Sequence, residues 1–223
     1  MKPKVTVVLP TLYEESIFEV IHDIYRLLGR DTEIIAIARG GDEYFRKLRK
    51  LGVKVVYQKV KSVEGSIRIG FNMAKGELLA STDSDATHDS SGLLKAVKMI
   101  EAGEADMVMG NRMNKLQPGS MGTYVAFGNR ALSLIFSILY RMRLHDILTG
   151  LFVMDRKSFE LMKNIKPYRA GTAFFVMEAA KRGARIKEVD IKYYPRKYGN
   201  TKLSRFKLAY GLALGVRLIA HII

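Results

Sequence analysis

The chain has 223 residues, 48% of them hydrophobic, and a formal net charge of +15 at pH 7. This length suits one large α/β domain or two small ones, and the hydrophobic content excludes a largely disordered chain. The absence of cysteine excludes a disulfide framework, a thiolate metal site and a cysteine nucleophile. The charge favours anionic partners: nucleic acid, nucleotide diphosphates or an acidic membrane surface. The N-terminal residues lack the apolar run of a signal peptide.

Apolar, β-branched segments alternate with segments of helical periodicity in the first half of the chain. The predicted strands are 4–9, 33–38, 53–57, 78–82 and 107–109, and the predicted helices are 14–28, 42–51, 65–75 and 93–101. Glycine follows several of these helices, as is typical of helix ends. The alternation predicts an α/β fold with a Rossmann-like, mostly parallel central sheet, right-handed crossovers and flanking helices.

The alternation fades after residue 112. The predicted elements that follow are a long helix at 127–142, a strand at 152–154, helices at 159–164 and 174–181, and a strand at 186–194. The helix at 127–142 is too short, and too polar at its ends, to span a membrane. No repeat or linker interrupts the chain, which predicts one domain over 1–202.

The C-terminal segment 203–223 is apolar but is interrupted by Arg205, Lys207, Arg217 and His221. A membrane-spanning helix needs about 20 mostly apolar residues with few charges. The segment is therefore predicted to be an amphipathic helix that lies in the interface of an anionic membrane. A terminal helix packed on the core is the alternative.

Two acids separated by one residue follow the fourth predicted strand. Because ligands of parallel sheets bind beyond the carboxyl ends of the strands, Asp83 and Asp85 stand where a ligand is expected. Two carboxylates this close repel each other unless a positive charge lies between them. Hard oxygen ligands suit Mg²⁺ or Mn²⁺ and leave coordination positions for phosphates. A solvated turn that caps the helix beginning near residues 89–91 is the alternative.

Further motifs, each weak alone, occur in a specific order. They are Leu9-Pro10-Thr11 with Glu14-Glu15, Asp83-Ser84-Asp85, Gly110-Asn111-Arg112, Gly128-Asn129, Asp146 with Thr149-Gly150, and Tyr194-Pro195-Arg196 with Gly199 and Thr201-Lys202-Leu203. Together they resemble family 2 glycosyltransferases of GT-A fold, and most of all the polyprenyl-phosphate (dolichyl-phosphate) mannose and glucose synthases. The resemblance covers nearly the whole chain.

The resemblance implies roles for individual residues. Asp83 and Asp85, with Thr87 as a weaker third ligand, would bind the metal. Arg196 and Lys202 would lie in a loop that folds over the donor diphosphate. Both would stabilise the charge that develops on the leaving group. The full set of implied donor-binding positions is Pro10, Leu12, Glu14, Ala38, Asp83, Ser84, Asp85, Arg196 and Lys202.

The chain departs from the family pattern at several positions. Ala38 and Arg39 replace two acids at the end of the second strand, one of which contacts the nucleoside, and Leu12 replaces an aromatic residue. Thr87 replaces a glutamine. The neighbouring His88 could substitute for it, but we interpret His88 as an ordinary turn histidine. Recognition of the donor's nucleobase is therefore the part of the resemblance that the sequence supports least.

The implied reaction is inverting transfer of a hexose from a nucleoside diphosphate sugar, of the GDP-mannose or UDP-glucose type, to a polyprenyl phosphate. A phosphate monoester has a second pKa of about 6, so this acceptor needs no strong base. Arg112 and Arg130 would hold that phosphate. The alternative for Arg130 is an ordinary surface arginine of a helix. A hydroxyl acceptor would need a base, and Asp146 is the candidate. The alternative is that Asp146 only caps the turn before Thr149.

Two hypotheses from other classes remain. The net charge suits a nucleic-acid-binding domain, but no recognition motif or aromatic stacking platform supports one, so no nucleic-acid partner is expected. Ala38 and Arg39 suit a non-catalytic, glycosyltransferase-like partner protein. The resemblance favours an enzyme that is cytoplasmic and peripheral to the cytoplasmic face of a membrane.

Overall fold

The structure is a computed structural model that describes residues 2–60, 62–166, 168, 170–197 and 216. Lys202 and the predicted helix at 203–223, apart from Val216, lie outside the described residues. Val216 is helical and exposed. The interfacial helix and the domain boundary at residue 202 therefore stay predictions. Among the described residues, no helix is both long and apolar enough to cross a membrane.

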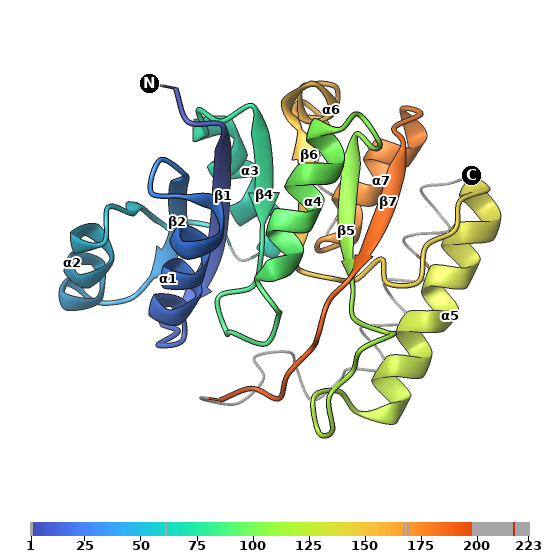
Figure 1. Cartoon of the computed structure of the whole chain (residues 1–223), viewed down its shortest axis with the longest axis horizontal. Coiled ribbons are helices and arrows are strands. Elements are labelled where there is room, and N and C mark those ends of the chain that lie inside the picture. The colour runs from blue at the N-terminus through green and yellow to red at the C-terminus, as the bar shows by residue number, and fades with distance from the viewer. Residues whose placement is uncertain (1, 61, 167, 169, 198–215, 217–223) are drawn as a thin grey trace.

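The described strands and helices alternate through most of the chain, as predicted (Figure 1). The strands are β1 (Val5–Leu12), β2 (Glu33–Arg39), β3 (Lys54–Tyr57), β4 (Leu78–Ser81), β5 (Met107–Asn111), β6 (Phe152–Asp155) and β7 (Ile186–Asp190). The helices are α1 (Ile17–Leu28), α2 (Asp42–Lys50), α3 (Val63–Met73), α4 (Ser91–Glu101), α5 (Thr123–Tyr140), α6 (Arg156–Glu160) and α7 (Ala173–Lys181).

Within the described residues, seven strands form one sheet in the order β3-β2-β1-β4-β6-β5-β7. All neighbouring strands pair in parallel except β6, which is antiparallel to both β4 and β5. The mostly parallel α/β sheet predicted from the sequence is confirmed. The insertion of β6 between β4 and β5 was not predicted, because the pattern of a short apolar strand does not specify its partners.

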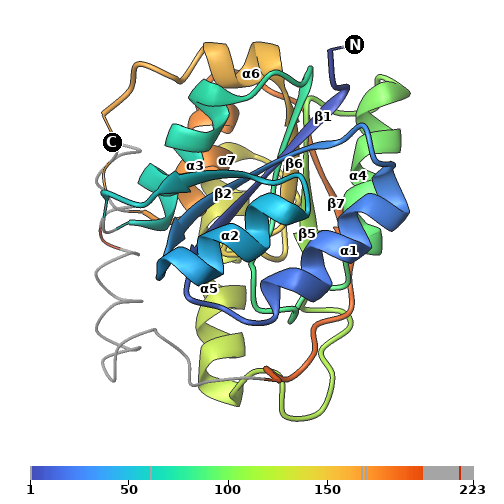
Figure 2. The same ribbon diagram turned by 90° about the vertical axis from the view of Figure 1, so that its left-hand side faces the viewer.

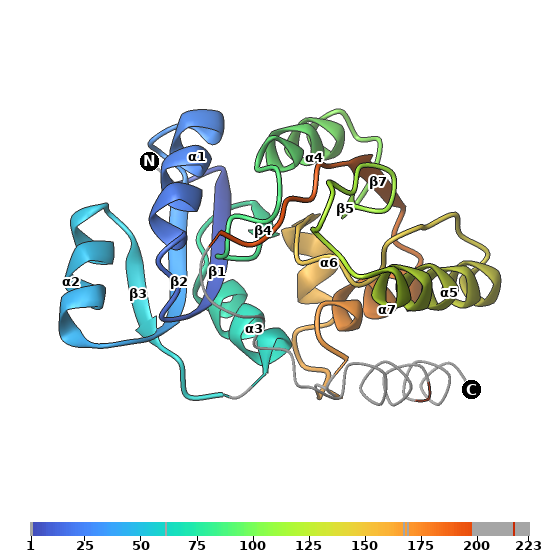
Figure 3. The same cartoon turned by 90° about the horizontal axis from the view of Figure 1, so that it is seen from below.

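Alternate side chains of the strands belong to two hydrophobic clusters, one on each face of the sheet. On one face, Val7 and Leu9 of β1 pack with residues of α1, α2 and α4. On the other face, Val8 packs with residues of α3, α5, α6 and α7. Figure 3 shows α1 and α4 on one side of the sheet and α3, α7 and α5 on the other. Burial of both faces explains why the strands read as continuous apolar runs.

Two element boundaries differ from the prediction in ways that shape the site. The first helix begins at Ile17 rather than at residue 14, because Tyr44 holds the backbone of Glu14 through its hydroxyl group. The last strand ends at Asp190 rather than at residue 194. The residues that follow bond instead to the loops after β4 and β5: Tyr194 N–H donates to the carbonyl of Thr87 over 2.8 Å.

Candidate metal and nucleotide site

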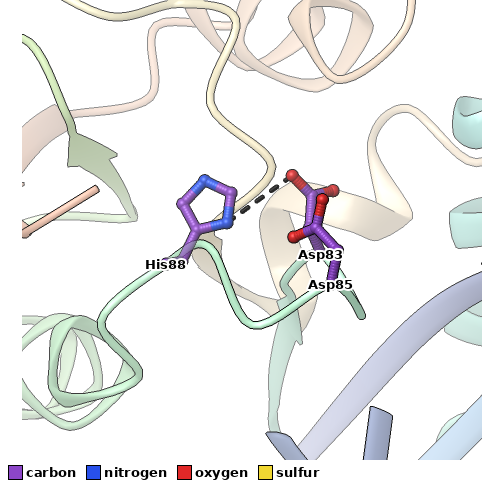
Figure 4. Close-up of side chains that lie close together, drawn as sticks. All are labelled: Asp83, Asp85 and His88. Carbon is purple, nitrogen blue, oxygen red and sulfur yellow. Dashed lines mark ion pairs between the residues drawn. The ribbon is translucent and has the colours of Figure 1, made fainter. Parts of the chain in front are cut away.

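Three potential metal ligands converge beyond the carboxyl end of β4. Asp83, Asp85 and His88 each offer one ligand atom, and these atoms all lie within 4.8 Å of one another. Nδ1 of His88 lies 3.5 Å from Oδ2 of Asp83 (Figure 4). The two carboxylates predicted as metal ligands therefore face the same small volume, together with His88, which the sequence indicates only as a turn residue.

His88 is buried, and neither of its ring nitrogens has a hydrogen-bond partner within the described residues. Burial and the nearby charge of Arg112 lower its pKa from 6.5 to about 4, against the opposing effect of Asp85. The ring is therefore neutral at pH 7 and keeps a lone pair for a cation. A buried imidazole without a partner, beside two carboxylates, fits a divalent metal ion such as Mn²⁺ or Mg²⁺.

Thr87, the predicted third ligand, donates its hydroxyl proton to Oδ1 of Asp85 over 2.7 Å. Its backbone N–H bonds to the same oxygen over 3.2 Å. Both bonds orient the Asp85 carboxylate. A direct bond from Thr87 to a metal stays a prediction.

Asp83 is enclosed by groups from several parts of the chain. Its side chain keeps 42% of its surface accessible, but the carboxyl group lies deep enough that desolvation raises its pKa. The charges of Arg112 and Arg196 oppose that rise. A cation beside Asp83 would likewise favour its ionised form.

Arg112 and Asp146 form a buried ion pair behind the metal ligands. Nε and Nη2 of Arg112 donate to Oδ2 and Oδ1 of Asp146 over 2.6 and 2.8 Å, and Asn129 donates to Oδ1 over 2.6 Å. Burial alone would raise the pKa of Asp146, but Arg112 and Asn129 lower it below its usual value. The pair brings together three motifs that lie far apart in the sequence. Because Asp146 is fully buried and occupied on both oxygens, the geometry makes it the partner of Arg112 and does not support it as a base.

Arg196 reaches the site from the segment after β7. It forms an ion pair with Glu14, and its Nη1 lies 3.8 Å from Oδ2 of Asp85. Ser84 donates to the carbonyl of Pro10 over 3.0 Å, which joins the ends of β1 and β4. Thus the structure brings together five residues predicted to bind the donor.

The other predicted nucleotide-binding residues lie at the ends of β1 and β2. Leu12 is partly exposed and pairs in register with Arg39, whereas Ala38 is fully buried. Residues 37–40 include no acidic side chain. The nucleobase of a donor bound here would therefore not contact the acid that is typical of the family at this position. Tyr13, which the sequence did not single out, is 61% exposed and its ring lies 5.0 Å from that of Tyr44.

Arg130, predicted to hold the acceptor phosphate, lies on α5 and is exposed. Its Nη2 donates to the carbonyl of Met113 over 3.1 Å, in the loop that follows β5. Arg112 is instead buried in its pair with Asp146. The two arginines therefore have different surroundings, and Arg130 is the more accessible of the two.

Comparison with known proteins places this arrangement in a family. The model of glycosyl transferase family 2 matches residues 6–161. The chain is 28% identical over 210 residues to the low-salt glycan biosynthesis hexosyltransferase Agl6 of Haloferax volcanii, covering 92% of this chain and 51% of Agl6. It is also 28% identical over 199 residues to the glycosyltransferase AglJ of the same organism, covering 88% of this chain and 65% of AglJ. The chain thus spans between half and two thirds of these relatives.

A solved structure shares the fold. Glucosyl-3-phosphoglycerate synthase from Mycobacterium tuberculosis, in complex with Mn²⁺, UDP and glucosyl-3-phosphoglycerate, matches with a TM-score of 0.70 and 19% identity. The match covers 98% of this chain and 78% of that one. At this identity the likeness concerns the fold, which agrees with the predicted GT-A architecture. From its family match over most of its length, the chain belongs to glycosyl transferase family 2.

Proposed function

We propose that this glycosyltransferase moves a hexose, with inversion, from a nucleoside diphosphate sugar to a polyprenyl phosphate at the cytoplasmic face of a membrane. The observation that carries the choice of a lipid acceptor is the outer face of α5. That helix supplies Asn129 and Arg130 to the site and presents a row of apolar side chains to solvent.

The apolar face of α5 follows helical spacing. Tyr124, Phe127, Leu134 and Ile138 are 93%, 74%, 60% and 68% exposed. Residues three, four or seven apart share one face of a helix, so these four form a stripe opposite the buried side. Large apolar side chains exposed together mark a binding surface rather than ordinary solvent-facing helix. We define Tyr124, Phe127, Leu134 and Ile138 as the α5 stripe.

The α5 stripe suits a membrane surface. Figure 2 shows that α5 extends below the sheet, on the side toward which β1 runs from the N-terminus in Figure 1. Arg141 and Arg143 follow the helix and are exposed. Apolar groups beside basic ones suit the interface of an anionic bilayer. A polyprenyl chain would run along this surface, with its phosphate near Arg130.

The donor would bind where the acids converge. Asp83, Asp85 and His88 would hold Mg²⁺ or Mn²⁺, which would neutralise charge on the diphosphate leaving group. Arg196 is next to this position through its contact with Asp85 and would contribute a planar, bidentate cation to the same phosphates. The Mn²⁺ and nucleotide bound by the structurally similar glucosyl-3-phosphoglycerate synthase support this class of donor.

The state of Asp146 favours a phosphate acceptor over a hydroxyl acceptor. A hydroxyl acceptor needs a base within hydrogen-bonding reach, and Asp146 is buried and paired with Arg112. A lipid phosphate is already anionic at neutral pH, since its second pKa is about 6. Hexosyl transfer itself is supported by the similarity to the hexosyltransferase Agl6.

The test is a transfer assay with defined donors and acceptors. Purified protein is incubated with Mn²⁺ and labelled GDP-mannose or UDP-glucose, and with either polyprenyl phosphate in anionic vesicles or a soluble phosphoester such as 3-phosphoglycerate. We expect label in the lipid extract, and about a hundredfold less label with Asp85→Asn or without metal, because the charge on the leaving group would lose its stabilisation. Label only in the soluble phosphoester would overturn the lipid acceptor, and no transfer from any donor would support the non-catalytic hypothesis.

A further inference from the structure

The carboxyl edge of the sheet extends in two directions from the acids that follow β4. On one side lie β6, β5 and helix α5, which supplies Arg130 to the proposed acceptor site. On the other side lie β1 and then β2, and the hydrogen bond from Ser84 to the carbonyl of Pro10 joins the ends of β4 and β1. A nucleoside whose diphosphate binds at the acids therefore extends toward β2, two strand spacings or about 10 Å away.

Tyr13 follows β1 and places an exposed ring on this side of the edge. Its φ of 51° lies in the left-handed region that residues with a side chain rarely adopt. Its N–H donates to the carbonyl of Arg39 over 2.8 Å, so the turn stays attached to the end of β2. A Cβ at Gly40 would lie 3.2 Å from Cδ2 of Tyr13. The exposed ring is therefore held beside the residue that follows Arg39.

Arg39 is an exposed cation at the end of β2. Ala38, the preceding residue, is fully buried, as expected from the alternation of side chains along a strand. Within the part of the chain that the structure describes, the guanidinium group of Arg39 forms no hydrogen bond and no ion pair. Gln58, which follows the neighbouring strand β3, is instead buried and donates to Ser66 over 2.9 Å. Arg39 is therefore the cation that the end of β2 presents to a ligand.

An arginine selects a base by the acceptors on its edge. The planar guanidinium group has only donors, arranged as a fork that fits two adjacent acceptors. Guanine offers such a pair at O6 and N7, whereas adenine has a donor beside N7 and uracil has N3–H between its two carbonyl groups. Cytosine also has adjacent acceptors, O2 and N3, but its single ring offers a smaller stacking surface than a purine. Stacking on an aromatic ring is open to every base.

We infer that the donor carries guanine and that Tyr13 and Arg39 form the subsite for this base. The Tyr13 ring would stack on the base, and Arg39 would donate two hydrogen bonds to O6 and N7. This inference rests on the proposed function and chooses between the two donor types named there, GDP-mannose and UDP-glucose. An acidic residue at the same place would instead accept from the N–H groups of a base, so Arg39 reverses the polarity of the contact.

The primary experiment measures the affinities of GDP, UDP, CDP and ADP by isothermal titration in the presence of Mn²⁺. GDP is expected to bind about 10-fold more tightly than the other three, because a bidentate arginine contact discriminates between bases to about this degree. Equal affinities, or tighter binding of another nucleotide, would overturn the assignment of guanine.

Two variants of Arg39 separate the fork from the charge, with thermal unfolding as the check of folding. Arg39→Gln removes both, and Arg39→Lys keeps only the charge. Each should weaken GDP binding about 10-fold and change UDP binding by less than about twofold. Arg30→Gln is the matched control, since Arg30 is an exposed arginine between α1 and β2, at the opposite edge of the sheet. Retained preference for GDP in Arg39→Lys, or equal weakening of GDP and UDP in Arg39→Gln, would show that Arg39 acts through charge alone and that the inference is wrong.

Variants of Tyr13 and Asp42 test the stacking surface and a competing residue. Tyr13→Phe keeps the ring and should bind GDP like the unchanged protein, whereas Tyr13→Leu should weaken GDP about 10-fold. Unchanged GDP affinity in Tyr13→Leu would exclude Tyr13 from the subsite. Asp42, at the start of α2, is the exposed acid closest in sequence to Arg39. Asp42→Asn should keep the preference for GDP, and loss of that preference would make an acid the residue that recognises the base, against the inference.

The outcomes separate this inference from the proposed function. If the unchanged protein binds no nucleotide with Mn²⁺, the donor site and this inference fail together. A preference for UDP, with transfer from UDP-glucose to polyprenyl phosphate, would overturn this inference alone. Binding of GDP that depends on Arg39, without transfer to polyprenyl phosphate, would overturn only the proposed acceptor.

Discussion

Gly150 lies directly against the carboxyl group of Asp83. A Cβ at position 150 would lie 2.4 Å from Cγ and from both carboxylate oxygens of Asp83. Such an approach is far inside van der Waals contact, so any other residue at position 150 would displace the carboxylate. Gly150 precedes β6, the strand that pairs antiparallel with β4. The pairing of β6 thus brings a glycine to the point where a metal ligand needs space.

Gly150→Ala should therefore move Asp83 out of the metal site. We expect Mn²⁺ binding to weaken about 10-fold or more, and the free energy of unfolding to fall by about 1–3 kcal/mol through overpacking. Isothermal titration with Mn²⁺ and urea denaturation measure the two effects. Gly128→Ala is the control, because a Cβ there meets nothing within 4 Å. Equal Mn²⁺ affinity in both variants would show that Asp83 is not a ligand.

Acid should destabilise the metal-free protein through His88. Its pKa falls from 6.5 to about 4 in the folded state, by burial and by Arg112. Below pH 6.5 the unfolded chain binds a proton that the folded protein excludes, so stability falls as the pH drops toward 4. At about 1.4 kcal/mol per pKa unit, the loss amounts to about 3 kcal/mol.

Denaturant unfolding in EDTA at several pH values measures this effect of His88. His88→Gln should flatten the profile between pH 6.5 and about 4. His22→Gln, which alters an exposed histidine on α1, is the control variant. A profile for His88→Gln that has the slope of the unchanged protein would contradict the burial of a neutral His88.

Asp146→Asn should destabilise the folded protein, because it leaves the buried charge of Arg112 without its partner. Removing one partner of a buried ion pair typically destabilises a protein by about 3–5 kcal/mol. Although burial raises the pKa of Asp146, Arg112 and Asn129 outweigh it and hold the folded pKa below 3.8. The stabilisation is therefore complete above pH 3.8 and is lost as the pH falls through the lower, folded value.

Urea unfolding at pH 7 and at pH 3 compares the two forms of residue 146. The difference in the free energy of unfolding between the unchanged protein and Asp146→Asn should be constant from neutral pH down to about pH 4. Below about pH 4 this difference should shrink. Asp190→Asn is a useful control, since Asp190 takes part in an exposed hydrogen bond with Asn114. A difference for Asp146→Asn that does not change down to pH 3 would argue against an ionised Asp146 as its source.

The α5 stripe should govern vesicle binding. Replacing Phe127 and Ile138 together with serine removes two of its exposed apolar side chains. We expect co-sedimentation with anionic vesicles to fall at least 10-fold, because burial of each such side chain contributes about 1.5–3 kcal/mol. Leu161→Ser is the control, as Leu161 is 57% exposed but lies outside α5. Equal loss in the control, or none in the double variant, would count against membrane docking through α5.

The α/β architecture could be predicted from the sequence, because the hydrophobic pattern within each short segment indicates whether it is a strand or a helix. The runs that became β1, β2 and β4 are apolar on both faces, and the acids after β4 mark the edge at which parallel sheets bind ligands. Asp83 and Asp85 could therefore be predicted to face one volume. Their order with the other motifs also indicated the family, which the match over residues 6–161 confirms.

Contacts between distant segments decided the rest. His88 looked like a turn histidine, and only the folded loop shows its ring buried beside Asp83 without a hydrogen-bond partner. Asp146 looked like a base or a cap, and its pairing with Arg112 joins residues from different elements. No local pattern reports the direction of a side chain or the charge that it will meet.

Sequence alone therefore determined where the first strands end on the binding edge of the sheet, because a helix between two strands returns the chain so that the next strand runs parallel to the first. Tertiary structure decided which of those residues meet. The antiparallel insertion of β6 brings Gly150 to Asp83, and the early end of β7 brings Tyr193 to His88. Such contacts depend on packing between segments far apart in the chain, which no short stretch of residues encodes by itself.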